Sequence, residues 1–376
     1  MRSLLLIISV ILFFSCSDEL LNPSENLELV PVLELQMTQE TLNNLRTNRT
    51  NDAEFNTNIF YKGQKYKGEI EASGAGSRYN PRWSYKIELK DEKVIEGLSE
   101  FNLSAQVHDP LMLNTAIAVN YYKLVGLPTF NNLHVFLKVN NEDEALLVLL
   151  ERIDREFFEK RNLPVSQLFK VGFGAKFSFK EGFYPQFHFE KKIPDDNSFY
   201  FLENLIYAID TSSSANLIVS LEKYLDIQNY IKYHVATSIL NNDDSFNNNF
   251  YLIKETKESP FKVIPWDFDK CFSRLNDVKY AGENAIIKKL FENKLVFEMY
   301  KTELIYQLDH FYTEDNLFGI IDSTSSLIKE AYNIDRFLGK ERYNFDSEIQ
   351  KLKDYILQRR AYLINNINNF SQSYFN

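Results

Sequence analysis

A strict alternation of apolar and polar residues marks the first part of the chain as strand-rich. Between positions 83 and 90 the apolar residues are Trp83, Tyr85, Ile87 and Leu89, and the polar ones are Ser84, Lys86, Glu88 and Lys90. Successive side chains of a strand point to opposite faces, so this pattern predicts a strand with one buried face. Lys86 is expected to point away from that face. We interpret residues 30–91 as a series of strands.

The next segment carries helix signals at both ends. Asp109 is a candidate N-cap, Pro110 suits the first turn, and Gly126 ends the pattern. The predicted apolar face of this helix consists of Leu113, Ile117, Tyr121 and Leu124.

Two strands are expected at 133–139 and 145–150, followed by a second helix that Asp154 can cap. Glu151 ends the nearly all-apolar second strand, where a buried carboxylate needs a partner. Lys86 is one candidate for that partner.

Periodicity changes again further along the chain. Glycines interrupt an aromatic segment that we interpret as an irregular insertion. Further along, Asp226 can cap a helix whose apolar residues recur at helical spacing and form one buried face. The predicted elements are an insertion at 165–185, a helix at 226–240, strands at 250–254 and 261–265, and helices over most of 281–376.

Polar residues gather after that helix and again after the last strand. Asp244 and Asn249 are five residues apart, the separation of the catalytic aspartate and the metal-binding asparagine in kinase loops. A hairpin and then Asp267 follow in the order that kinases use for the aspartate that binds magnesium. Asp243 and Asn248 have the same spacing, so an acidic loop or a calcium-binding turn stays an alternative.

The glycine turn at 73–78 precedes the strand of Lys86. Small residues in such a turn let backbone amides approach an anion, and kinases place a lysine one strand after a glycine-rich loop. A hairpin turn followed by a solvated strand lysine is the alternative interpretation.

The N-terminus resembles a bacterial lipoprotein signal peptide. Residues 1–3 are positively charged, 4–14 are apolar but too short to span a bilayer as a mature helix, and Cys16 follows a serine. The resemblance implies that Cys16 is lipidated, that 17–29 form a tether, and that the protein is anchored in the cell envelope. The acidic residues after Cys16 resemble the surface-export tag of Bacteroidetes lipoproteins, which implies the outer-membrane surface.

Composition narrows the function classes. The 376 residues are 44% hydrophobic and 25% charged, as in globular proteins. The net charge of −10 argues against nucleic-acid binding, which needs Lys and Arg to displace counterions from phosphates. With Cys16 lipidated, Cys271 is left without an intrachain partner, and a lone cysteine is usually a small buried hydrophobe.

Four ordered segments, 74–87, 149–154, 244–252 and 264–269, resemble motifs of the CotH kinase family, atypical protein kinases named for a bacterial spore-coat protein. The resemblance implies ATP, Mg²⁺ or Mn²⁺ as cofactors, and phosphorylation of a protein hydroxyl. It implies Asp244 as the catalytic residue and, as metal ligands, Asn249, Asp267 and Asp269. The nucleotide-binding residues that it implies are Gly74, Gly76, Arg82, Lys86 and Glu151.

Two departures from the family pattern, and the scarcity of ATP at the location that the N-terminus implies, leave other functions open. The family has Arg-Gly before the turn and Pro-Lys-Lys-Ser after it, where this chain has Ser73-Gly74 and Pro81-Arg82-Trp83-Ser84. A catalytically inactive envelope or adhesion protein is one alternative, and a calcium-dependent binding module is another. The expected fold is α+β and divergent kinase-like, with a strand-rich N-lobe at about 30–160 and a helical C-lobe at about 161–376.

Overall fold

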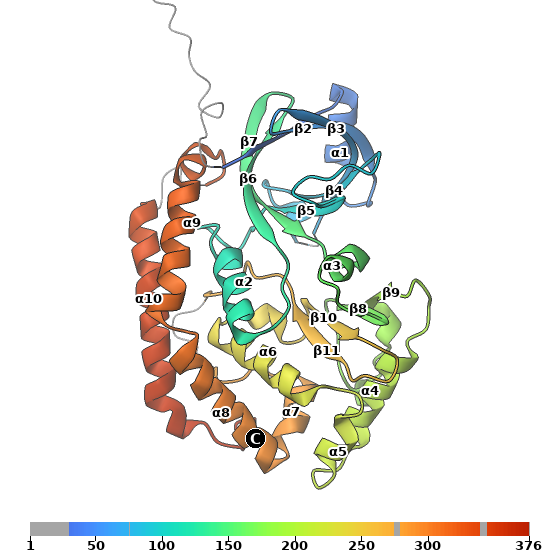
Figure 1. Ribbon diagram of the computed structural model, residues 1–376, viewed down its shortest axis with the longest axis vertical. Coiled ribbons are helices and arrows are strands. Elements are labelled where there is room, and N and C mark those ends of the chain that lie inside the picture. The colour runs from blue at the N-terminus through green and yellow to red at the C-terminus, as the bar shows by residue number, and fades with distance from the viewer. Residues whose placement is uncertain (1–29, 75, 274–278, 339–343, 376) are drawn as a thin grey trace, which may run out of the picture.

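In the part of the chain that the computed structural model describes, residues 30–74, 76–273, 279–338 and 344–375, seven strands close into a β-barrel. The barrel is the upper lobe in Figure 1. The strand order is β1-β2-β3-β4-β5-β7-β6, and β1 pairs with β6 in parallel to close it. The strands are β1 (Val32–Gln36), β2 (Phe55–Tyr61), β3 (Gln64–Ser73), β4 (Ser84–Leu89), β5 (Glu100–Ser104), β6 (Asn132–Val139) and β7 (Glu142–Glu151).

Alternate side chains of these strands fill the barrel. The predicted alternation in β4 is confirmed, because Ile87 and Leu89 are buried in this core and Lys86 lies on the opposite face. Burial of each such side chain stabilises the fold by roughly 1.5–3 kcal/mol. Other core members, one or two from each strand, are Leu33, Ile59, Ile70, Phe101, Leu103, Leu137 and Leu149.

One helix interrupts the region expected to contain strands alone. Helix α1 (Gln39–Thr47) begins after Thr38, whose hydroxyl accepts a hydrogen bond from the Thr41 amide at 3.1 Å. It buries Leu42 and Leu45 against the barrel. The prediction is wrong here because two leucines three residues apart are a weak periodic signal.

Helix α2 (Asn114–Val125) begins later than predicted. The Asp109 carboxylate accepts hydrogen bonds from the amides of Leu111 at 3.1 Å and Asn114 at 2.7 Å, so it shapes the turn before the helix and does not cap it. Gly126, with φ of 86°, ends the helix as expected. Leu124 is exposed, so the predicted apolar face is wrong at that position.

The lower lobe contains a second sheet of order β11-β10-β8-β9. Its strands are β8 (Gln167–Val171), β9 (Phe189–Ile193), β10 (Phe250–Lys254) and β11 (Lys262–Pro265). The predicted β10–β11 hairpin is confirmed. The interpretation of 165–185 as irregular throughout is wrong, because β8 is an interior strand that pairs with β10 on one side and β9 on the other.

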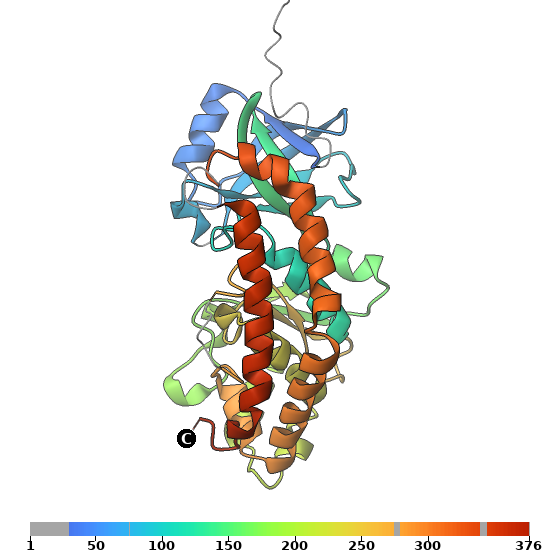
Figure 2. The same ribbon diagram turned by 90° about the vertical axis from the view of Figure 1, so that its left-hand side faces the viewer.

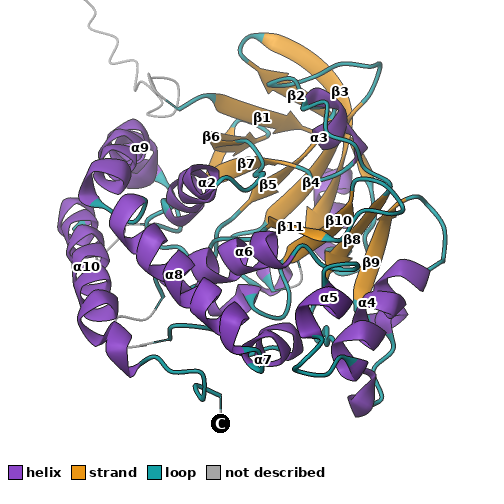
Figure 3. Cartoon of the chain, turned by 60° about the horizontal axis from the view of Figure 1, so that its bottom comes forward, coloured by secondary structure: helices purple, strands orange, loops and turns teal. Residues whose placement is uncertain are grey.

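Helices make up most of the rest, as predicted for the C-terminal part. They are α3 (Arg155–Lys160), α4 (Tyr200–Thr211), α5 (Leu217–Leu221), α6 (Ile227–Ile239), α7 (Ala285–Phe291), α8 (Lys294–His310), α9 (Glu314–Ile334) and α10 (Phe345–Asn366). Asp226 caps α6 by accepting a hydrogen bond from the Asn229 amide at 2.9 Å. Helices α9 and α10 lie side by side along one flank, and α9 reaches the barrel (Figure 2). Helix α6 lies between the second sheet and α8 (Figure 3).

The predicted α+β class, with a strand-rich N-terminal part and a helical C-terminal part, is confirmed. Within the described ranges, none of the helices combines the length and the apolar character needed to cross a membrane. The predicted signal peptide, Cys16 and the 17–29 tether lie outside the described residues.

The buried His234 predicts a pH-dependent contribution to stability. Its Nε2 is hydrogen-bonded to the Gly282 carbonyl at 3.0 Å, and burial lowers the pKa of His234 to about 3. Below about pH 6.5 the unfolded chain binds a proton that the folded chain does not, so this histidine destabilises the fold as pH falls.

In His234→Gln this penalty is absent. The stability advantage of the wild type over His234→Gln, measured by urea unfolding, should shrink by up to about 1.4 kcal/mol for each pH unit between 6.5 and 5. An advantage that stays constant with pH would contradict the assignment of a neutral buried imidazole.

Candidate active site

The loop after α6 is tied to the loop after β11 by one buried amide. Asn242 Nδ2 donates to Ser245 Oγ at 2.8 Å and to the backbone oxygen of Asp267 at 3.0 Å. Among the residues that the structure describes, its buried Oδ1 has no hydrogen-bond partner. Leaving such an acceptor unsatisfied costs about 1–3 kcal/mol, so the loops meet at a point that is poised to bind a donor or a cation.

Asp244 and Asn249, predicted from their spacing, are in direct contact. Asn249 Nδ2 donates to Asp244 Oδ2 at 2.9 Å, and Lys270 Nζ contacts the same oxygen at 2.8 Å. The alternative residue Asp243 is bound elsewhere, because Lys279 Nζ lies 3.1 Å from both of its carboxylate oxygens. Of the two residue pairs with this spacing, the structure therefore brings Asp244 and Asn249 into contact, and Asp243 binds Lys279 instead.

Backbone hydrogen bonds fix where Asn249 sits. Its amide donates to the Val171 carbonyl at 3.1 Å, and its carbonyl accepts from the Trp266 amide at 3.2 Å. Asn249 and Asp267 both have positive φ, 60° and 62°, a conformation that Asn and Asp tolerate better than most residues. The ends of β8, β10 and β11 thus bring Asn249 and Asp267 to one edge of the second sheet.

Asp267 and Asp269 form a half-buried acidic pair. Burial raises the pKa of both carboxyl groups, and neighbouring carboxylates raise it further: those of Asp269 and Asp244 act on Asp267, and those of Asp109 and Asp244 act on Asp269. Negative charges gathered away from water repel one another, and a bound cation would relieve that repulsion.

The donor set fits a hard divalent cation. Carboxylate and amide oxygens are the ligands that Mg²⁺ and Mn²⁺ favour, and the Asn249 amide nitrogen is already bound to Asp244, which leaves its oxygen for a cation. Across the described ranges, no three His, Cys, Asp or Glu side chains are placed to hold a metal alone. Mg²⁺ usually takes one or two carboxylates and completes its shell with water and phosphate.

Lys86 and Glu151 lie on opposite faces of the barrel wall. Lys86 is opposite Asn102 on β5, and Asn102 is opposite Leu150 on β7. Directly opposed residues share a face, so Lys86 lies on the face of Leu150 and not on that of Glu151. The predicted pairing of Lys86 with Glu151 is wrong, because one residue along a strand reverses the direction of the side chain.

Each of these two residues has another partner. The Glu151 carboxylate is bound by the Arg161 guanidinium at 2.6 and 2.7 Å, and it accepts the Asn131 amide at 2.8 Å. Lys86 Nζ lies 3.4 Å from Glu54 Oε1. Glu151 is therefore satisfied by a residue at the end of α3, and Lys86 by a residue that precedes β2.

The glycine turn follows β3. Gly74 has φ of 86°, and a Cβ added at Gly76 would meet no heavy atom within 4 Å, so the backbone at Gly76 is open on that side. Arg78 from this turn pairs with Asp52 in the segment between α1 and β2. The charge of Arg78 is thus neutralised by a residue of the barrel lobe.

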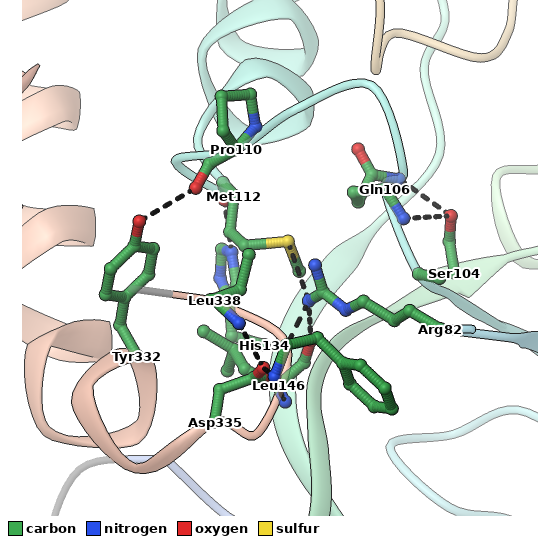
Figure 4. Close-up of polar contacts among 12 residues, drawn as sticks. Arg82, Ser104, Gln106, Pro110, Met112, His134, Leu146, Tyr332, Asp335 and Leu338 are labelled. Carbon is green, nitrogen blue, oxygen red and sulfur yellow. Dashed lines mark hydrogen bonds and ion pairs between the residues drawn. The ribbon is translucent and has the colours of Figure 1, made fainter. Parts of the chain in front are cut away.

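Arg82 is buried where the barrel meets the end of α9 (Figure 4). Its guanidinium donates to the Leu146 carbonyl, lies 3.0 Å from Met112 Sδ and 3.9 Å from Asp335 Oδ2, and has its pKa lowered by burial. The structure corrects the expectation for this residue, because it places Arg82 in an interior ion pair rather than beside the acidic cluster.

Two cations that act on the acidic cluster, Lys270 and Lys170, and a third that acts on Lys170, Arg152, were not among the predicted site residues. Lys270 directly follows Asp269 in the same motif, and Arg152 directly follows Glu151, so sequence proximity could have indicated both. Lys170 had no such signal, since it lies on β8 in the segment interpreted as irregular. Its charge acts on Asp267.

A strand-rich lobe above a helical lobe, with half-buried carboxylates and a positioned amide at a sheet edge, defines an α+β protein with a candidate site for a cation and an anionic ligand. The family described as CotH kinase protein matches residues 65–363, well over half of the chain. The chain therefore belongs to the CotH kinase family. It is 23% identical over 310 residues to the inner spore coat protein H of Bacillus subtilis, covering 78% of this chain and 86% of that protein.

Similar solved structures include a Helicobacter pylori proinflammatory kinase, CtkA, at 12% identity and a TM-score of 0.36, covering 84% of this chain and 93% of that one. The Golgi casein kinase with Mn/ADP bound has 10% identity and a TM-score of 0.33, covering 90% of this chain and 74% of that one. Because these TM-scores are low, membership of the family rests on the sequence match.

The Arg82–Asp335 contact predicts a large loss of stability on truncation. Asp335 accepts hydrogen bonds from the amides of Leu146 at 2.6 Å, Phe337 at 2.6 Å and Leu338 at 2.8 Å. Asp335→Ala leaves these donors and the buried Arg82 charge unpaired, so it should cost roughly 3–5 kcal/mol in denaturant unfolding.

Asp309→Ala is the control. Asp309 forms an exposed ion pair with Arg360 at 3.4 Å, and its loss should cost less than about 1 kcal/mol. Equal costs for the two variants would show that Asp335 does not hold the barrel to α9.

Proposed function

We propose that this protein is a Mg-ATP-dependent protein kinase of CotH type that phosphorylates a protein hydroxyl. The observation that carries the proposal is the acidic cluster, in which the half-buried Asp267 and Asp269 lie near Asp244 and the like charges raise the pKa of both. Carboxyl groups held close together and partly out of water are a costly arrangement that a bound metal ion would offset.

Each residue has a distinct proposed role. Asp267, Asp269 and the amide oxygen of Asn249 would hold Mg²⁺ or Mn²⁺, and the metal would neutralise charge on the phosphates of ATP. Asp244 accepts the hydrogen bond of the substrate hydroxyl and orients it. Asn249 and Lys270 position Asp244 by binding its Oδ2 at 2.9 and 2.8 Å, which leaves Oδ1 to face the substrate.

The test is ligand-dependent thermal stability, followed by phosphate transfer. Mg²⁺ with ATP should raise the Tm of the wild type, and Asp267→Asn should abolish the rise because it removes one metal ligand. The Tm of ligand-free Asp267→Asn should be unchanged or higher, since the variant also removes the repulsion. Asp243→Asn is the matched control and should keep the rise, because Lys279 binds that residue.

The same experiment separates the alternatives. Stabilisation by Mg-ATP without transfer of labelled γ-phosphate to any protein would favour a catalytically inactive kinase-like binding protein. Stabilisation by Ca²⁺ alone would favour a calcium-dependent binding module. The absence of any shift at millimolar ATP with Mg²⁺ or Mn²⁺ would refute the kinase proposal.

We also propose that the protein is a lipoprotein of the cell envelope, anchored through Cys16 and exposed at the outer-membrane surface. This proposal is supported by the charged start, the short apolar stretch and the cysteine at the N-terminus of the sequence.

Cys16→Ala should abolish labelling by a radioactive fatty acid in bacteria and move the protein from the membrane fraction to the soluble fraction. Cys271→Ala is the control and should keep both properties, because Cys271 is buried in the fold. Labelling of Cys16→Ala would place the lipid elsewhere.

A further inference from the structure

Lys170 lies on β8, an interior strand of the second sheet, one residue before the end of the strand. It is opposite Tyr251 on β10 and Glu190 on β9, so these three side chains share one face. Its neighbour Val171 accepts the hydrogen bond from the Asn249 amide, the residue that contacts Asp244. β8 therefore places a lysine beside the strand end that carries the candidate metal ligands.

The ammonium group of Lys170 is held without a counter-ion. In the described parts of the chain it makes no hydrogen bond and no ion pair, although it is half-buried. Burial lowers the pKa of Lys170, and only the more distant carboxylates of Glu190 and Asp267 oppose that effect. A cation held partly out of water without a partner is costly, and groups with perturbed pKa values cluster at functional sites.

The other cations of this region are already paired. Arg152 pairs with Glu100 and lies 4.0 Å from Asp154. Lys192 pairs with Glu190, the residue opposite Lys170.

The remaining two lysines are paired as well. Lys270 contacts Asp244, and Lys86 lies against Glu54. Lys170 is thus the one among these five cations whose charge is left for a ligand.

We propose that Lys170 binds the phosphate chain of the nucleotide, the role that the glycine turn and strand order had suggested for Lys86. This inference rests on the proposed function. An anion bound to a cation at Asp267 comes within the field of Lys170, whereas Lys86 lies on the barrel wall with its charge directed to Glu54. A lysine is a compact point charge, which suits a phosphate group whose position is set by the metal.

The experiment titrates residues 17–376 with two probes, Mg-ADP and Mn²⁺ alone, and measures the affinity for each by calorimetry. Lys170→Met should weaken Mg-ADP binding by about tenfold or more, because a charge-assisted contact is lost. It should leave the affinity for Mn²⁺ alone unchanged or tighter, because a positive charge near the carboxylates is removed. A merely structural role would weaken both affinities together.

Two further variants sharpen the result. Lys170→Arg should recover most of the Mg-ADP affinity, and Lys86→Met should leave it unchanged. If the wild type and Lys170→Met bind Mg-ADP equally well, this inference is overturned while the proposed function stands. The same holds if Lys86→Met loses Mg-ADP binding and Lys170→Met keeps it. A wild type that binds neither probe would overturn the proposed function as well.

Discussion

The pairing of β10 with β8 on one side and β11 on the other is the constraint on which the candidate site depends. Through it, the backbone of Asn249 is bonded to Val171 and Trp266, and these bonds bring three chain segments, far apart in the sequence, to one sheet edge. Asp244 is then held by the Asn249 amide, and Asp267 turns out of β11 with a positive φ. A shift of one residue in either pairing would reverse the side-chain faces and separate these groups.

The charges at this edge are unevenly balanced. Asp244 has two donors, Asn249 and Lys270, and so it is held in place. Partial burial and neighbouring carboxylates instead raise the pKa of Asp267 and of Asp269. The sheet and α6 supply the rigid support that keeps these groups together despite their repulsion. Other parts of the fold offset this repulsion. They include the barrel core and the contacts of Asp335 with three backbone amides and with Arg82.

Much of the fold could be predicted because its signals are local. The alternation in β4, the cap of α6 by Asp226 and the β10–β11 hairpin each depend on residues close together in the sequence. Helix α1 and strand β8 were not predicted because their local signals are weak. Both elements are short, and β8 is defined by its neighbours in the sheet rather than by its own pattern.

The sequence by itself determined the order of the acidic motifs, their spacing and the α+β class, because local periodicity and the resemblance of ordered motifs to a family survive without coordinates. Only the tertiary structure decided which charges meet. Glu151 is paired with Arg161 rather than Lys86, and Arg82 is interior. Lys170 has no ion-pair partner among the described residues, and the charge of Asp267 acts on it. The physical reason is that ion pairing depends on register and on which face of a strand a side chain occupies, and both are set by the pairing of distant strands.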